Sequence, residues 1–308
     1  MISSERRYLG CLLGLACGDA VGTTVEFAPR GSFAPVTDML GGGPFGLEPG
    51  QWTDDTSMAM CLAESLLECN GFDLADQLHR YVRWWKHGHL SSTGECFDIG
   101  STAAGALYFH LRNGNLVADT DDPMMAGNGS LMRLAPVVLW LHPDTGSAIA
   151  HAARSSLTTH AAPEAVDCCR LLAAVICNAL AGKHKDELLA GSLHHLSEPE
   201  VRELAEGHYR RKAREQMCGS GYSVQSLEAA LWCVHVTDSF EQAILTAANL
   251  GDDADTTAAI TGQIAGALYG VEGIPLQWLA TLHQAELIAG FAQRIYQHVE
   301  NAANGAAP

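Results

Sequence analysis

Basic residues are scarce in this chain, which has 18 Lys+Arg against 35 Asp+Glu and a formal net charge of −17. The longest basic run is the short stretch 210–212. Proteins that bind nucleic acid or anionic membranes depend on basic side chains to neutralise phosphate charge. We therefore expect neither general nucleic-acid binding nor a membrane partner.

Paired cysteine spacing and long apolar runs are also missing. The ten cysteines are scattered, mostly within apolar segments, and no CxxC pair occurs. They are typical of reduced core residues. No run approaches eighteen uninterrupted apolar residues, and the apolar stretch near the N-terminus is broken by Gly10, Gly14, Gly18 and Asp19, unlike a signal peptide. The sequence thus predicts a soluble, cytoplasmic protein, which we expect to be a monomer.

Alternating β-branched runs are nearly absent, whereas alanine and leucine dominate segments with apolar residues at three- and four-residue spacing. This pattern predicts an all-α fold. A hydrophobic content of 47% is ample for one domain over residues 1–300, followed by a disordered polar tail over 301–308. The expected helices are 8–19, 56–69, 74–85, 102–111, 131–141, 163–180, 226–234, 240–249, 256–269 and 274–298. Within the first, the spacing of Gly10 and Gly14 indicates close helix packing.

Two short acidic clusters, 53–56 and 252–257, stand at expected helix starts. A pair of aspartates at a helix start is usually a cap. The second cluster has three aspartates within four residues, which repel one another unless a cation compensates them. Carboxylates and hydroxyls without cysteine or histidine suit Mg²⁺ or Mn²⁺ rather than zinc. If the fold brings the two starts together, a divalent-metal site results.

The second cluster has a favourable geometry for such a site. In a first helical turn, Asp253, Asp255 and Thr256 can point into one common volume beyond the helix end. We expect Asp252 to face elsewhere and to act as a cap.

Other polar positions have two interpretations each. Glycines flank the asparagine in 127–129, where backbone N–H groups could approach a phosphate or sugar, although a simple turn explains them equally. His160 could be an ordinary polar residue before a helix, and Tyr222 could stack on a base or simply pack. Asp98 could cap the next helix or be a buried acid with a perturbed pKa.

Seven segments, which occur in order over nearly the whole chain, resemble the ADP-ribosylglycohydrolase family. They are GCLLGLACGDAVGTTVEF (10–27), WTDDTSMAM (52–60), FDIGSTAAGAL (97–107), GNGSLMRLAPV (127–137), SLTTHAAPEA (156–165), GYSVQSLEAALW (221–232) and LGDDADTTAAITGQIAGALYG (250–270). The resemblance implies a compact single-domain orthogonal helical bundle with a cleft that holds two Mg²⁺ or Mn²⁺ ions. It also implies hydrolysis of the N-glycosidic bond of ADP-ribosylated arginine on a protein partner, with release of ADP-ribose.

The resemblance also assigns roles to individual positions. The metal ligands would be Thr53, Asp54, Asp55, Asp253, Asp255 and Thr256. The catalytic carboxylates would be Asp98 and Glu26. The ADP-ribose pocket would be lined by Gly127, Asn128, Gly129, Ser130, His160 and Tyr222. Ser101 departs from the larger polar residue expected here in similar members of the family, and this departure bears on recognition of the leaving group.

Three other possibilities stay open, one of which, a role in nitrogen regulation, depends on the host organism. The enzyme could cleave a different ADP-ribosyl linkage, to serine, to acetate in O-acetyl-ADP-ribose, or to nucleic acid. Alternatively, the protein could bind ADP-ribose without catalysis. The second alternative would leave a costly cluster of like charges without a use.

Overall fold

The computed structural model describes residues 2–305 and is built from helices. The α-helices are α1 (Ser4–Gly22), α2 (Asp54–Glu68), α3 (Leu74–His87), α4 (Ser101–Asn113), α5 (Ala135–Leu141), α6 (Thr145–Ser156), α7 (Pro163–Leu180), α8 (Pro199–Ala205), α9 (Ser223–Val236), α10 (Phe240–Ala248), α11 (Ala254–Tyr269), α12 (Leu276–Thr281) and α13 (Ala285–Ala303). Within residues 2–305, β pairing is limited to two isolated bridges, Gly42 with Leu47 and Gly127 with Tyr222. The predicted all-α class is confirmed.

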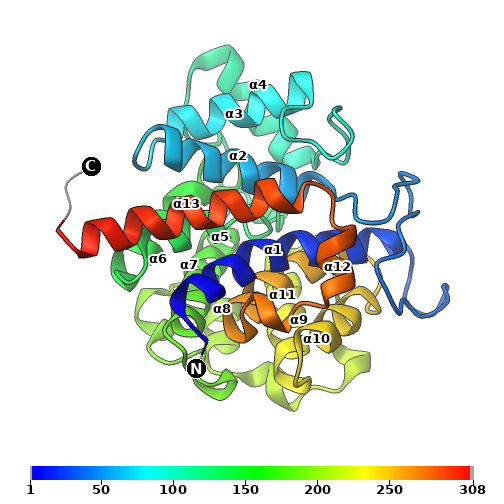
Figure 1. Ribbon diagram of the computed structural model, residues 1–308. Coiled ribbons are helices and arrows are strands. Elements are labelled where there is room, and N and C mark those ends of the chain that lie inside the picture. The colour runs from blue at the N-terminus through cyan, green and yellow to red at the C-terminus, as the bar shows by residue number, and fades with distance from the viewer. Residues whose placement is uncertain (1, 306–308) are drawn as a thin grey trace.

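Helix α1 runs through the middle of the molecule, between α2, α3 and α13 on one side and α9 to α11 on the other (Figure 1). Its sequence explains that place, because leucine, alanine and cysteine occupy almost every turn and leave no polar face. The helix is also long and apolar enough to cross a membrane by length and composition. However, 94% of its most apolar 18-residue stretch is buried inside the protein, so α1 is a core helix.

Glycines bring α1 and α11 unusually close together. A Cβ atom added at Gly14 would lie 2.4 Å from the carbonyl oxygen of Gly262, and one added at Gly18 would lie 2.1 Å from that of Ala258. The same crowding at Gly10 confirms the packing role predicted for Gly10 and Gly14, and Gly18 shares it. The contacts run in antiparallel order, so the C-terminal end of α1 lies beside the N-terminal start of α11.

Several predicted helix boundaries were wrong. The sequence pattern missed α6 and α8, and it placed the start of α5 four residues early, at 131. Residues 131 and 132 instead form a turn because their carbonyl groups accept hydrogen bonds from the Gln263 side chain, at 3.1 and 2.9 Å. Pro136 then lies in the first turn of the shortened helix, a position that proline favours.

The helix expected over 274–298 is two helices, α12 and α13. The break is fixed by the segment before α2, since the His283 N–H donates to the Gly50 carbonyl at 2.9 Å and the His283 carbonyl accepts from Trp52 Nε1 at 3.0 Å. At the other end, α13 continues through Ala303 and so enters the segment 301–308 that was predicted as a tail. Residues 306–308 lie outside the described part.

Candidate metal and substrate site

The two acidic helix starts meet. Thr53 is the N-cap residue of α2 and Asp253 that of α11, and neither side chain caps its own helix. Instead, the Thr53 hydroxyl lies 3.2 Å from Asp55 Oδ2 and 3.3 Å from Asp255 Oδ2, and the Thr256 hydroxyl lies 3.4 Å from Asp55 Oδ2. Residues about two hundred positions apart in the sequence therefore share one buried cluster.

Two carboxylate oxygens in this cluster lack a partner. Asp55 Oδ1 and Asp255 Oδ1 are fully buried, and neither has a hydrogen-bond partner among the described residues. A buried carboxylate oxygen without a donor is costly, and a cation is the usual remedy. The donor set is made only of carboxylates and hydroxyls, so it fits a hard divalent ion such as Mg²⁺ or Mn²⁺.

Two further carboxylates, those of Glu26 and Asp98, lie against the same cluster. Glu26, Asp98 and Asp255 each offer an oxygen, and these oxygens lie within 4.8 Å of one another. Glu26 follows the short helix after α1, and Asp98 precedes α4. The two residues predicted as catalytic thus lie beside the predicted ligand Asp255.

The packed carboxylates raise one another's pKa values. Burial, followed by the charges of neighbouring acids, raises the pKa of Asp98 to about 7 and that of Glu26 to about 9. Burial also raises the pKa values of Asp54, Asp55 and Asp255 well above their ordinary range, again with neighbouring carboxylates adding to the effect. Without a cation, the cluster retains protons at neutral pH. A bound divalent ion would replace those protons.

Asp19 is a site residue that sequence reasoning did not identify. It is fully buried near the end of α1, where its carboxylate accepts from the backbone N–H groups of Thr53 and Thr56 at 2.9 and 3.0 Å. The hydroxyls of the same two threonines also donate to it, at 3.0 and 2.6 Å. Asp19 thus caps α2 from another helix. Its sequence signal is that it is the one charged residue in the apolar stretch 8–22.

A cavity of about 740 Å³ opens above the cluster, a volume typical of small-molecule sites. The predicted site residues that line it are Glu26, Asp54, Asp98, Gly127, Asn128, Gly129, His160, Asp253 and Thr256. Thr53, Asp55 and Asp255 lie buried beneath this lining, linked to it by the contacts described above. Thr102, Met132, Cys218, Ser220 and Gly221 also line the cavity, and the sequence did not indicate them.

Two predicted pocket residues do not line the cavity. The Ser130 hydroxyl is buried, where it accepts from the Ser156 hydroxyl at 2.8 Å. Tyr222 pairs by its backbone with Gly127, while its hydroxyl donates to Glu200 of α8 at 2.7 Å. In this structure, Ser130 and Tyr222 therefore support the wall of the cavity rather than forming its surface.

Asp252 does not face away from the site as expected but lines the cavity. Phe27, Asp98 and Asp252 all line it and all have left-handed backbone conformations, with φ values of 60°, 58° and 59°. Such conformations are uncommon for these residues and concentrate at functional sites. The Phe27 N–H donates to the Asp252 carbonyl at 2.7 Å, so two of these segments hold each other in place.

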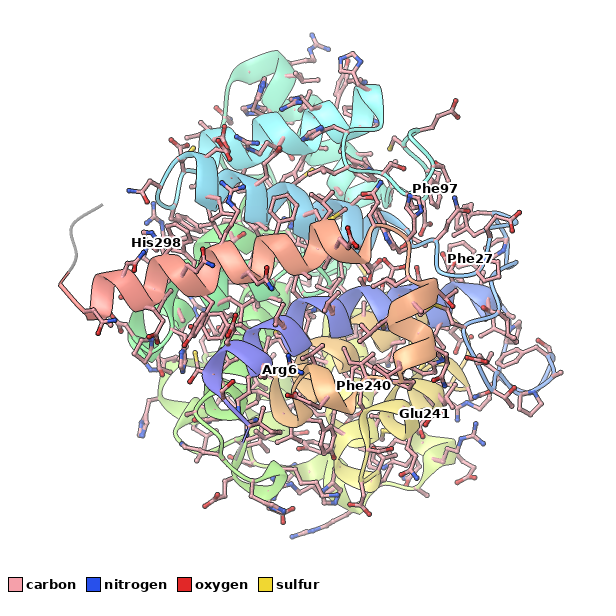
Figure 2. All side chains as sticks on the ribbon, viewed as in Figure 1. Arg6, Phe27, Phe97, Phe240, Glu241 and His298 are labelled. Carbon is pink, nitrogen blue, oxygen red and sulfur yellow. The ribbon has the colours of Figure 1, made fainter. Side chains whose placement is uncertain are left out.

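Aromatic rings border the mouth of the cavity near Asp98. Phe27 is 63% exposed, and its ring centroid lies 6.5 Å from that of Phe45. The Phe45 centroid in turn lies 5.2 Å from that of Phe97. Figure 2 shows Phe27 and Phe97 on the same edge of the molecule.

The loop 127–129 forms part of the cavity wall. Asn128 Nδ2 donates to Asp253 Oδ2 at 2.7 Å and to the Ser226 hydroxyl at 3.1 Å, so the loop is tied directly to a predicted metal ligand. His160 packs against the loop, since a Cβ atom added at Gly129 would lie 2.8 Å from its ring. Glycine is needed here because the ring occupies the space of a side chain.

Comparison with known proteins agrees with this architecture. The profile of the ADP-ribosylglycohydrolase family matches residues 2–305. The ADP-ribosylarginine hydrolase Tri1 of Pseudomonas putida (strain GB-1) is 47% identical, over 94% of this chain and 78% of its own length. The ADP-ribosyl-(dinitrogen reductase) glycohydrolase of Rhodospirillum rubrum is 34% identical, over 91% of both chains.

Solved structures show the same relationship. A structure described as an ADP-ribosylglycohydrolase-related protein complex superposes with a TM-score of 0.85 at 41% identity, covering 96% of this chain and 99% of that one. The family profile spans nearly every residue, and the relatives are similar over most of their length. The chain is a member of the ADP-ribosylglycohydrolase family.

Proposed function

We propose that this protein is a metal-dependent hydrolase that cleaves the N-glycosidic bond between ADP-ribose and a protein arginine. The single observation that carries the proposal is the meeting of the α2 and α11 starts beneath a cavity of about 740 Å³. Relatives that are 47% and 45% identical are named ADP-ribosylarginine hydrolases, which supports the same activity for this chain.

The charge of the cavity supports both the metal and the arginine linkage. Five carboxylates line it, and none of the described residues in its lining is a lysine or arginine. The two phosphates of ADP-ribose would be repelled by such a surface unless cations were bound there. A positively charged guanidinium leaving group is, by contrast, complementary to it.

The ligands for two ions would come from both helix starts. Thr53, Asp54 and Asp55 would contribute from α2, with Asp253, Asp255 and Thr256 from α11. Divalent ions held there would supply Lewis-acid stabilisation of the reacting sugar and would lower the pKa of the attacking water. The unpartnered oxygens of Asp55 and Asp255 are the features of the chain that favour this assignment.

The protein's own carboxylates would move the protons. Asp98 lies partly exposed at the cavity, where a guanidine nitrogen could receive a proton from it. As the bond from ribose C1″ to the guanidine nitrogen breaks, Asp98 would donate that proton to the departing arginine. Glu26 is more deeply buried and would take up the proton that the attacking water loses as its oxygen bonds to C1″. The carboxylates around the sugar would stabilise the positive charge that develops on it.

The cellular setting is part of the proposal. All ten cysteines are free thiols in the structure, and seven of them are buried, as expected for a protein of a reducing compartment. We therefore assign the enzyme to the cytoplasm and expect it to act as a monomer on modified protein substrates.

A linkage assay tests the proposed function. Matched proteins carrying ADP-ribose on arginine or on serine are incubated with the enzyme in Mg²⁺ or Mn²⁺, and free ADP-ribose is measured. We expect release from the arginine-linked protein and little from the serine-linked one. Faster release from serine would transfer the activity to that linkage, and no release from either, with ADP-ribose still bound, would indicate a non-catalytic binder.

A further inference from the structure

The side chain of Arg133 is buried without a carboxylate partner. It is 1% exposed, in the turn between the loop 127–129 and α5, and no acid among the described residues lies within ion-pair distance of it. Its guanidinium lies 4.6 Å from the centre of the Tyr81 ring, and its Nη1 lies 3.7 Å from the sulfur of Met58. An unpaired buried cation is costly, so its retention needs a reason.

The polar contacts of Arg133 lead towards the cavity. Its Nη2 donates to the hydroxyls of Thr158 at 3.1 Å and Thr159 at 2.6 Å. The Thr159 oxygen then lies 2.8 Å from Nδ1 of His160. His160 is in turn one of the residues that line the cavity.

The direction of these hydrogen bonds is set by the arginine. A guanidinium can only donate, so the Thr159 oxygen accepts from Arg133 and keeps its own hydrogen for another acceptor. Among the described residues, the remaining partner of that hydroxyl is His160 Nδ1. If Nδ1 carried a hydrogen instead, the threonine hydrogen would have no acceptor. The arrangement that uses every group therefore places the ring hydrogen of His160 on Nε2.

We propose that Arg133 and Thr159 are positioning residues that hold His160 in the Nε2–H tautomer, so that it donates a hydrogen bond to an oxygen of ADP-ribose in the cavity. This inference rests on the proposed function for the identity of the ligand. The hydrogen-bond relay, which runs from Arg133 through Thr159 to His160, depends only on the protein.

The surroundings of His160 agree with that assignment. Nε2 has no hydrogen-bond partner among the described residues, and it is not among the fully buried unpartnered atoms. It points to the loop 127–129, since Cβ atoms added at Gly127 and Gly129 would lie 3.3 and 3.1 Å from it. Burial, reinforced by the charge of Arg133, lowers the pKa of His160 to about 3. The ring is therefore neutral at pH 7 and has a single N–H.

The relay can be read directly by nuclear magnetic resonance. Histidine is labelled with ¹⁵N, the His160 signals are assigned by their loss in His160→Gln, and the two ring nitrogens are compared in the ligand-free wild type at pH 7. We expect a protonated Nε2 and an unprotonated Nδ1. A protonated Nδ1, or a ring with both nitrogens protonated, would overturn the proposal.

Variants test whether the relay serves the ligand. Thr159→Val keeps the side-chain volume but removes the hydroxyl, and we expect ADP-ribose to bind about tenfold more weakly in Mg²⁺ by calorimetry. The same variant should show a mixed tautomer. Thr159→Ser retains the hydroxyl and should restore both measurements. The matched control is Thr158→Val, which removes the other acceptor of Arg133 but no hydrogen bond to His160.

The outcomes separate the relay from the proposed function. Unchanged affinity in Thr159→Val, or an equal loss in Thr158→Val, would show that Thr159 has no specific role. No binding of ADP-ribose to the wild type would overturn the proposed function. The tautomer is measured without ligand, so it still tests the relay in that case.

Discussion

The residue that does most to shape the site is Asp19, which is not among the predicted ligands. One carboxylate on α1 accepts the first N–H groups and the threonine hydroxyls of α2. Burial raises the pKa of Asp19 to about 6, although the hydrogen bonds from Thr56 and Thr53 oppose that effect. Asp19 therefore leaves the side chains of Asp54 and Asp55 free to face the cluster instead of capping their own helix.

Asp19→Asn should damage both stability and activity. Asparagine offers one acceptor oxygen where the carboxylate offers two, so some of these buried donors lose their partner. We expect the free energy of unfolding to fall by about 1.5–3 kcal/mol in chemical denaturation. We also expect ADP-ribose release to slow by about tenfold or more, because displacement of the α2 start misplaces the ligands.

The matched control for that variant is Asp73→Asn. Asp73 caps α3 away from the cavity, and asparagine caps a helix equally well. Both stability and activity should stay near wild type. If Asp19→Asn behaves like Asp73→Asn, Asp19 has no part in organising the site.

At the residue scale, the sequence predicted the chemistry of the cluster but not the residues that hold it in position. Three aspartates within four residues are costly without a cation, and that local argument points to a metal. The roles of Asp19 and Arg133 depend on partners far away in the chain, so no local pattern indicates them. Asp252 was misassigned because its left-handed backbone turns it towards the cavity instead of into a capping position.

Among the elements, the pairing of α1 with α11 positions the site. Glycines on both helices let the backbones touch, and a Cβ atom added at Gly22 would lie 2.5 Å from Asp255 Cα. The end of α1 therefore sets where Asp255 lies relative to Glu26. Close packing of this kind leaves little freedom for the predicted metal ligands to move.

Gly18→Ala tests that pairing. Alanine favours helix formation, but its methyl group would lie 2.1 Å from the Ala258 carbonyl oxygen, so the helices must separate. We expect the free energy of unfolding to fall by about 1–3 kcal/mol. ADP-ribose release should also fall, since the α11 start moves away from Glu26.

Gly105→Ala is the control, because Gly105 lies on α4 with open space at its Cβ position. That variant should raise stability by up to about 1 kcal/mol through helix propensity alone. A stabilising effect of Gly18→Ala as well would show that the α1–α11 contact can relax without cost.

Periodicity predicted most helices, and it failed where tertiary contacts override local preference. The continuous apolar pattern over 274–298 hides a break that contacts with Gly50 and Trp52 create. The start of the predicted 131–141 helix was likewise too early, because the pattern does not show the hydrogen bonds of Gln263. Neither contact leaves a trace in the local sequence.

For the whole molecule, the buried cluster of carboxylates is the feature that makes stability depend on pH. Because burial raises their pKa values, the carboxylates of the folded metal-free protein bind more protons than those of the unfolded chain. This contribution to stability is fully present when the pH is below the pKa values of the same carboxyl groups in the unfolded chain, which are near 4. It is lost as pH rises through the folded values of about 6 for Asp19, about 7 for Asp98 and about 9 for Glu26.

The metal-free protein should therefore lose thermal stability between about pH 5 and pH 9. Saturating Mg²⁺ should replace the protons and remove most of that decline, because metal affinity grows as the ligands ionise. Calorimetric melting temperatures across this range, in chelator and in Mg²⁺, measure both effects. Equal pH slopes in the two series would show that no divalent ion occupies the cluster.

The central claim is that the starts of α2 and α11 jointly hold the divalent ions. Anomalous diffraction from a crystal grown with Mn²⁺ tests it most directly. We predict anomalous peaks in contact with oxygens from both helix starts, including Asp55 and Asp255. Peaks that touch only one helix start, or none in the cluster at saturating Mn²⁺, would contradict it.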